Sequence, residues 1–357
     1  SYIGVSKTQL KRRNLLNQQL MKPIILLILV LFCFDCSNSS DFNNGIIQEN
    51  KLSLWCVPES EIGGGTSFFP LLETPNYQSI SFINSLNYLS ENSKVAILMF
   101  NDDIFVFPYD FTNYYEVINT NLDNSNLIFS YCPLTQSALC FNNNSELTTK
   151  NSMKASGYLY KDNLILADSA LEEYWSQMDA KVIRGTNKTE RIQTYNLIET
   201  FWKVAQTNFP NAKVFYHENT NFCSGCETYE VATSYNNLFG VINEHVREDT
   251  VHLYNYNALS NNAEVQTITI NGKKTIVVGN KNLPYFNAFY IPSSLEFSLL
   301  DASEFPLIIQ DNENTKWDVF GRAIEGPRKG TTLNSPKCFI AGEWAWVDFY
   351  EKRILHF

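Results

Sequence analysis

Short apolar segments separated by turn-forming residues fill most of the chain beyond residue 52. Residues 95–100 and 104–107 combine β-branched and aromatic side chains and are joined by three polar residues, which is the pattern of a β-hairpin. The dipeptide Asn271-Gly272 suits a type I′ turn and joins two further apolar segments, so it predicts another hairpin. Further strands are predicted at residues 127–131, 138–141, 156–160, 164–167, 239–242 and 251–256.

One segment has helical rather than alternating periodicity. Between residues 190 and 207, apolar side chains recur at helical spacing, and Phe209-Pro210 ends the pattern. The apolar positions are Ile192, Leu197, Phe201, Val204 and Ala205. Together the patterns predict an α+β, mainly β fold of short antiparallel strands and hairpins with a few helices.

Two tryptophan motifs resemble each other. Gly185 follows Trp175 by ten residues, and Gly326 follows Trp317 by nine. The hairpin at residues 239–256 likewise resembles the one at 95–107. We interpret these similarities as a degenerate internal two-fold repeat, with halves at about residues 52–210 and 211–357. Chance similarity between two β-rich halves is the alternative.

The N-terminal region has the character of a targeting segment. Residues 23–34 form an apolar run of 12 residues, whereas a membrane-spanning helix needs roughly 20. The run closes near Cys36, and the polar residues 37–51 follow it. We therefore predict upstream residues and a lipoprotein signal peptide over 1–36, lipid attachment at Cys36, a tether over 37–51, and one globular body over 52–357. An uncleaved anchor and an ordinary signal peptide remain open, and residues 1–20 are either upstream sequence or a long basic region of the signal.

This targeting segment predicts an exported protein of a bacterial cell envelope, lipid-anchored at the periplasmic or outer-membrane face. Hydrophobic residues make up 44% of the chain and charged residues 18%, which is typical of a packed globular protein. The net charge of −10 argues against binding to a nucleic-acid backbone. The expected partners are the membrane, through the lipid anchor, and an unknown small molecule or envelope protein.

Export makes disulfides possible, and Cys223 and Cys226 are the closest pair in the body. A metal site is the alternative for this pair, but His217 is the one histidine nearby, and no second cysteine pair of this spacing exists. We therefore predict a Cys223–Cys226 disulfide and neither a metal site nor a cofactor. The chain contains no GxSxG, HExxH or phosphate-binding loop motif, so whether it is an enzyme stays open.

Several ordered motifs resemble the domain-of-unknown-function 3179 family over about residues 55–350. They are Glu61-Ile62-Gly63-Gly64-Gly65, Ser130-Tyr131-Cys132-Pro133-Leu134-Thr135, Ser156-Gly157-Tyr158-Leu159-Tyr160 with Tyr174-Trp175-Ser176-Gln177, Trp317-Asp318-Val319-Phe320-Gly321-Arg322-Ala323-Ile324-Glu325-Gly326-Pro327, and Trp344-Ala345-Trp346-Val347-Asp348-Phe349. The resemblance implies no assigned activity. Many family members carry a second cysteine where this chain has Thr135, so a dithiol is absent here. Some members are selenoproteins, which implies redox chemistry at a cysteine position, and we assign that position to Cys132.

Cys132 is the candidate catalytic residue. It precedes Pro133 at a predicted strand end, where a thiol can be held rigidly, and Cys140 is the candidate resolving partner. A nucleophilic thiol needs a lowered pKa, and no neighbouring cation in the sequence supplies one. A buried, inert cysteine is the alternative. The leading hypothesis is thiol-dependent redox chemistry or ligand binding centred on Cys132.

The tryptophan motifs support a second hypothesis, a non-enzymatic envelope binding protein. The candidate ligand-binding residues are Trp175, Gln177, Trp317, Arg322 and Glu325, which would line a shared groove between the repeats. The alternative is that both tryptophans are core anchors. A third hypothesis is a soft-metal (copper) site built from Cys132, Cys140 and Met178.

The signal-peptide interpretation can be tested directly. Mass spectrometry of the membrane-extracted protein should find acyl groups on an N-terminal Cys36, because a lipoprotein signal is removed immediately before the acylated cysteine. A mature chain that still begins at Met21 or earlier would show that the segment is not a lipoprotein signal.

Overall fold

The computed structural model describes residues 54–65, 69–122, 124–144, 148, 150–218, 237–245, 248–259 and 262–356. The chain divides into two compact units, Ser1–Lys51 and Leu52–Phe357, and the described residues belong to the second. Cys36, Cys223 and Cys226 lie outside the described residues, so lipid attachment and the disulfide stay predictions. None of the helices within the described ranges has the length and apolar character needed to cross a membrane.

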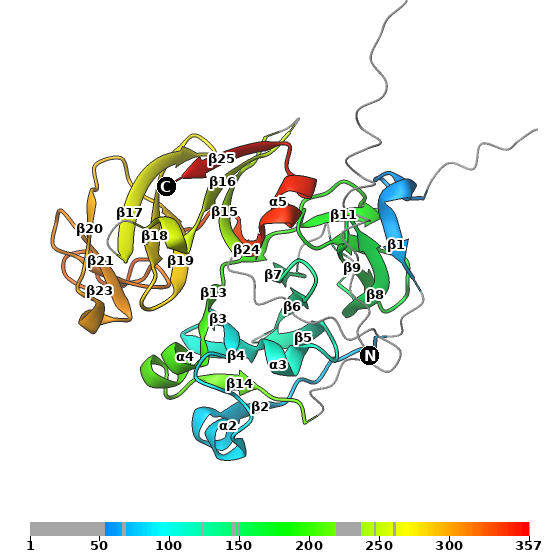
Figure 1. Cartoon of the computed structure of the whole chain (residues 1–357), viewed down its shortest axis with the longest axis horizontal. Helices are drawn as coiled ribbons and strands as arrows, with labels where there is room; N and C mark the ends of the chain where they lie inside the picture. The colour runs from blue at the N-terminus through cyan, green and yellow to red at the C-terminus, as the bar shows by residue number, and fades with distance from the viewer. Residues whose placement is uncertain are drawn as a thin grey trace, which may run out of the picture. The chain divides into compact units, whose positions relative to one another are not determined.

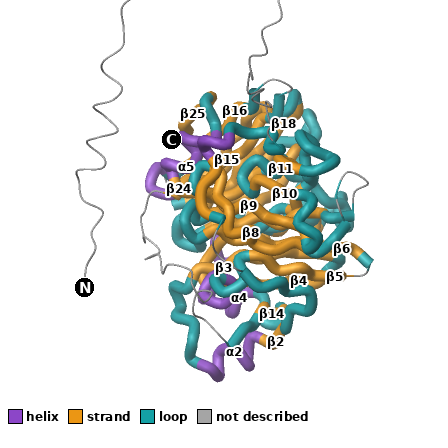
Figure 2. Tube along the Cα trace, turned by 90° about the vertical axis from the view of Figure 1, so that its right-hand side faces the viewer, coloured by secondary structure: helices purple, strands orange, loops and turns teal. Residues whose placement is uncertain are grey.

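Strands dominate the body. They account for 48% of it and helices for 12%, so the predicted α+β, mainly β fold is confirmed. The strands form several small sheets rather than one continuous sheet (Figure 1). Figure 2 shows helices α2 (Ile80–Leu86) and α5 (Glu343–Phe349) at opposite ends of a strand-rich interior.

The main sheet of the first half has the strand order β13-β3-β4-β14-β2. Its strands are β2 (Tyr77–Ser79), β3 (Lys94–Phe100), β4 (Asp103–Pro108), β13 (Ile198–Phe201) and β14 (Lys213–Phe215). Helix α4 (Trp202–Asn208) connects β13 to β14, which runs parallel to β4 and antiparallel to β2. The division near residue 211 thus precedes β14, a strand of the first-half sheet.

The main sheet of the second half repeats this plan in the order β24-β15-β16-β25. Its strands are β15 (Asn237–Asn243), β16 (Thr250–Tyr254), β24 (Cys338–Gly342) and β25 (Lys352–His356). Helix α5 connects β24 to β25, and β25 runs parallel to β16, as β14 runs parallel to β4. The two halves therefore share one topology, as the predicted internal repeat requires.

A second antiparallel sheet packs on each main sheet. In the first half it contains β5 (Val117–Leu122), β6 (Ser125–Cys132), β7 (Ser137–Asn142) and β12 (Thr194–Tyr195); in the second it contains β17 (Ala263–Ile270), β18 (Lys273–Asn280) and β19 (Tyr285–Tyr290). Stacked rings join the sheets, Phe107 with Phe129 at 4.1 Å and Phe239 with Phe286 at 5.2 Å between centroids. The short helix α3 (Tyr109–Thr112) follows β4, and the described residues also contain the 3-10 helices η1 (Glu59–Glu61), η2 (Tyr256–Ala258) and η3 (Ala302–Glu304).

The tryptophan motifs lie in a third pair of sheets. One contains β1 (Ile62–Gly64), β8 (Met153–Tyr160), β9 (Asn163–Asp168), β10 (Tyr174–Ser176) and β11 (Lys181–Arg184); the other contains β20 (Phe297–Leu299), β21 (Leu307–Asp311), β22 (Lys316–Asp318) and β23 (Ala323–Glu325). Trp175 lies in β10 and Trp317 in β22. Gly185 and Gly326 follow β11 and β23, with φ of +126° and +94°. The repeated motifs are therefore structurally equivalent.

The halves share their hydrophobic cores. One cluster of buried residues includes Ile97 and Trp202 from the first half with Ile276 and Trp317 from the second. Another combines Trp175 with Leu253 and Trp346. Because these two cores take side chains from both halves, the described residues beyond Leu52 form one body and not two independent domains.

The predicted hairpin turns are confirmed. Asn101 and Asp102 have φ of 46° and 67°, and Asn271 and Gly272 have φ of 51° and 71°. Positive φ at both central residues is the type I′ conformation, which matches the right-handed twist of the flanking strands. Asn, Asp and Gly adopt this conformation at low cost, which is why the sequence identifies these turns.

The predicted helix over residues 190–207 is wrong over most of its length. Residues 194–195 and 198–201 are strands β12 and β13, and the helix begins only at Trp202. Ile198 is 2% exposed, because β13 pairs with β3 and lies against the core. Cross-strand pairing has overridden the local helical periodicity, as tertiary contacts often do.

The Trp-motif glycines should be more sensitive to substitution than turn glycines. In Gly326→Ala the new Cβ would lie 2.6 Å from the Asn314 carbonyl oxygen, whereas a Cβ at Gly272 meets nothing within 4 Å. Both substitutions strain a positive φ at about 1–2 kcal/mol, and Gly326→Ala adds overpacking of about 1–3 kcal/mol. Urea unfolding should therefore show the larger loss for Gly326→Ala; equal losses would contradict the packing argument.

Candidate functional site

Cys132 is buried at the end of β6. Its side chain is 1% exposed, and burial, with the nearby Glu116 carboxyl, raises the pKa of the thiol. A nucleophilic cysteine needs the opposite environment, an accessible thiol with a lowered pKa. The structure therefore argues against thiol chemistry at Cys132 and favours the inert cysteine that the sequence left as the alternative.

Cys140 lies on the other face of the same sheet. It pairs with Phe129, three residues before Cys132, and an odd separation along a strand places side chains on opposite faces. Cys132 accordingly packs in the cluster that contains Ile128, while Cys140 packs in the one that contains Phe129. Cys140 therefore cannot act as the predicted resolving partner of Cys132. The predicted copper site is wrong for the same reason, because Met178 packs on the Cys132 side of the sheet and Cys140 on the other.

Gln177 belongs to a fully buried polar network beside Cys132. Its Nε2 donates to Ser130 Oγ at 2.9 Å, and its Oε1 accepts from Ser137 Oγ and Asn163 Nδ2, both at 2.7 Å. Asn163 Nδ2 also donates to Thr135 Oγ1 at 2.9 Å. None of these residues is measurably exposed, so the network holds the β6–β7 turn against β9 and is closed to solvent.

Both tryptophans are core anchors rather than walls of a groove. Trp175 is 0% exposed and Trp317 2%. Their indole Nε1 atoms donate to Glu173 Oε1 at 2.7 Å and to Asp311 Oδ2 at 3.1 Å, which satisfies the one polar group of each ring. The predicted tryptophan-lined groove is therefore absent from the described part of the chain.

Arg322 and Glu325 make ion pairs near these anchors. Arg322 Nε donates to Asp318 Oδ2 at 2.9 Å, and its Nη1 donates to Asp102 Oδ1 at 3.1 Å, which connects the second half to the first. Glu325 lies 3.9 Å from Lys316 and is largely exposed. Arg322 thus links the two halves, whereas Glu325 pairs within the second half, and neither residue converges with Gln177 on one site.

A carboxyl that the sequence analysis missed lies where the halves meet. Glu199 of β13 accepts hydrogen bonds from the Tyr109 hydroxyl and from the Ile340 backbone N–H, the latter at 3.1 Å. Burial raises the pKa of Glu199 to about 7 and lowers the pKa of the neighbouring Lys94. A carboxyl that titrates near neutral pH can accept and donate a proton. The sequence signal that could have identified this carboxyl is one acidic residue within the mainly apolar segment 197–201.

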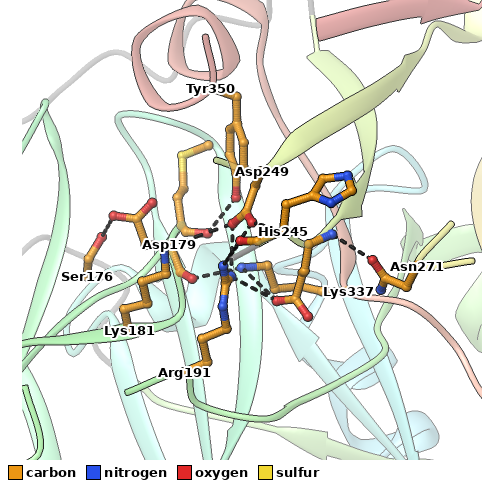
Figure 3. A network of polar contacts seen from close by, with 11 residues as sticks. Ser176, Asp179, Lys181, Arg191, His245, Asp249, Asn271, Lys337 and Tyr350 are labelled. Carbon is orange, nitrogen blue, oxygen red and sulfur yellow. Dashed lines mark hydrogen bonds and ion pairs between the residues drawn. The ribbon is translucent and has the colours of Figure 1, made fainter. Parts of the chain in front are cut away.

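A charged network joins the halves on another side of the body (Figure 3). Arg191 Nη2 donates to Asp249 Oδ1 at 2.8 Å, and Arg191 Nη1 donates to Glu244 Oε1 at 3.1 Å. Lys337 Nζ donates to the Asp179 carbonyl at 2.7 Å, and burial lowers its pKa to about 8. Since these cations all have partners within the network, it holds the halves together and does not form an open anion site.

One hollow of about 240 Å³ opens at the ends of β16 and β25. Leu238, Leu253 and Leu355 form apolar parts of its wall. Its polar lining includes Asn255, Glu343 and His356. An apolar hollow with a few polar groups is the usual form of a small-molecule site, although this one is smaller than most.

A histidine pair adjoins the hollow. His252 Nδ1 and His356 Nε2 lie 2.8 Å apart, within hydrogen-bonding distance. The ring centroids are 5.0 Å apart with an interplanar angle of 20°, so the imidazoles meet end to end and share one proton. Burial and the neighbouring His356 lower the pKa of His252 to about 4. Within the described ranges no group of three or more His, Cys, Asp or Glu side chains could hold a metal ion.

The family model described as "Protein of unknown function (DUF3179)" matches residues 67–353, which is most of the chain. The chain belongs to the DUF3179 family. This match agrees with the resemblance seen in the motifs, and the description of DUF3179 assigns no activity. No curated protein and no solved structure matches the chain.

In this DUF3179 chain, Glu199 should make stability depend on pH. Its pKa rises from 4.5 to about 7 on folding, so between these pH values the folded state binds more protons than the unfolded state. The free energy of unfolding should therefore fall as pH rises from about 4.5 to 7. Glu199→Gln should reduce this fall in the free energy of unfolding by about 1–2 kcal/mol, which is less than the full pKa shift implies because the Glu199 residue is only half-buried.

Urea unfolding at several pH values would measure the slope. Glu91→Gln is the matched control, because the Glu91 side chain is 64% exposed and carries a surface ion pair. An unchanged slope in Glu199→Gln would contradict the assigned pKa.

Proposed function

We propose that this DUF3179 protein is a non-enzymatic binding protein of the bacterial cell envelope, and that its ligand occupies the hollow beside His356. The observation that carries the proposal is that the hollow combines an apolar wall with a few polar residues in its lining. Cys132, Trp175 and Trp317, by contrast, are buried, and none of them lines the hollow. Binding at the hollow therefore replaces both the thiol and the tryptophan-groove hypotheses.

The polar groups of the hollow suit a ligand that has an apolar body and a hydrogen-bonding end. Glu343 accepts hydrogen bonds, Asn255 both donates and accepts, and His356 is already engaged with His252. The leucines around the hollow favour an aromatic or aliphatic group. A phenol such as p-cresol has this combination.

Export and lipid anchoring are part of the same proposal. The apolar run of residues 23–34 ending near Cys36 supports a signal, and the polar segment 37–51 provides a tether from the membrane to the body. A protein held in this way presents its binding surface to molecules of the envelope.

Binding can be tested with p-cresol and indole as probes. In NMR spectra with labelled leucine methyl groups, either probe should shift Leu253 and Leu355, because both side chains line the hollow. Ala258→Phe should weaken binding at least about tenfold, since it places a ring in the hollow that Ala258 also lines.

The control is Leu171→Phe, at a side chain that is 50% exposed elsewhere on the body. It should leave probe binding unchanged. Shifts that are absent from Leu253 and Leu355, or binding that survives Ala258→Phe, would remove the hollow as the site.

A further inference from the structure

β25 is an edge strand with an exposed surface. It pairs with β16 on one side, and no strand of the described residues pairs with its other side (Figure 1). Ile354 and Leu355 are 44% and 51% exposed, although both are aliphatic. An edge leaves a row of backbone N–H and C=O groups unpaired, and another extended backbone is the partner that satisfies such a row.

The first half shows how the equivalent edge is covered. β14 pairs with β4 in parallel on one side and with β2 in antiparallel on the other, where Phe215 lies opposite Tyr77 and Lys213 opposite Ser79. β2 leads directly into α2, which buries Ile80 and packs on β14. A strand followed by an apolar helical turn therefore closes the first-half sheet.

Sheet register identifies which residues correspond. Phe201 and Gly342 are both helix N-caps at the ends of β13 and β24. When paired residues are followed from these caps through β3 to β4 and through β15 to β16, Val106 of β4 corresponds to Leu253 of β16. Val214 pairs with Val106 and Leu355 pairs with Leu253, so Val214 corresponds to Leu355.

The same count matches Trp202 with Glu343, the first residues of α4 and α5. Trp202 Nε1 donates to Asn84 of α2 at 3.1 Å, so α2 lies over this corner of the first half. Leu253, Leu355 and Glu343 all line the hollow. The hollow thus occupies the place that β2 and α2 cover in the first half.

We propose that the outer edge of β25 and the hollow together bind an extended polypeptide segment of another molecule, antiparallel to β25, with an apolar side chain entering the hollow. This inference rests on the proposed function and names its class of ligand. Charge sets no preference for the added strand, because Lys352 Nζ pairs with Glu248 Oε2 at 2.6 Å and Arg353 Nη1 donates to the Val347 carbonyl at 3.3 Å.

The chain provides its own probe, a synthetic peptide of residues 75–88, which contains β2 and α2. Hydrogen exchange of the outward-facing amides of β25 should be fast in the free protein and slow once the peptide is added, because the new strand protects them. Leu355→Lys should weaken peptide binding at least about tenfold. Leu171→Lys is the matched control, since it makes the same change at a leucine that is 50% exposed in the first half.

The outcomes separate this proposal from the proposed function. If p-cresol binds in the hollow but the peptide leaves β25 exchange unchanged, the edge proposal fails and the small-molecule site stands. Slow exchange of the outward-facing β25 amides in the free monomer would mean that another part of the same chain already covers the edge. A dimer that Leu355→Lys dissociates would mean that a second copy occupies it, and each of these results overturns the proposal.

Discussion

Burial of apolar side chains across the boundary between the halves is the interaction on which the structure depends. Each half has its own main sheet, but the largest core combines Ile97 and Trp202 with Ile276 and Trp317. Neither half can bury these surfaces alone, because part of the covering layer comes from the other half. Polar groups at this boundary are consequently buried as well, and they must form hydrogen bonds or ion pairs with other protein groups instead of with water.

Three polar clusters show how differently this constraint is met. Gln177 and its partners satisfy one another completely, and their role is to fix the β6–β7 turn. Arg191 and Lys337 belong to a network in which opposite charges compensate burial. Glu199 is compensated least, because burial outweighs the effect of its hydrogen bonds and of Lys94 on its pKa. Glu199 therefore has a pKa of about 7 and can change its charge state near neutral pH.

The sequence predicted the features that local chemistry determines. The turns at Asn101 and Asn271 and the equivalence of Trp175 and Trp317 depend on backbone conformation and on motif spacing, which are visible in the chain itself. The predicted helix over residues 190–207 failed because β13 pairs with β3, a contact about 100 residues distant (198 minus 97 is 101).

The candidate sites failed for a related reason. Cys132 and Trp175 were selected for their residue types and motif positions, but burial decides whether such groups can act, and burial follows from tertiary packing. The hollow could not be predicted at all, because Leu238, Leu253 and Leu355 come together only through the pairing of β15, β16 and β25. Hydrophobic residues in a strand pattern carry no sign of which of them will line an opening.

The parallel strands β14 and β25 have a consequence for the order of folding. Lys213 pairs with Phe105, 108 positions earlier (213 minus 105), and Lys352 pairs with Thr250, 102 positions earlier (352 minus 250). Closing loops of this length costs entropy before the pairing is formed, so such contacts form late. During synthesis the β15–β16 hairpin therefore forms before β25 is available, and until then the side of β16 that β25 covers stays exposed to association with other chains.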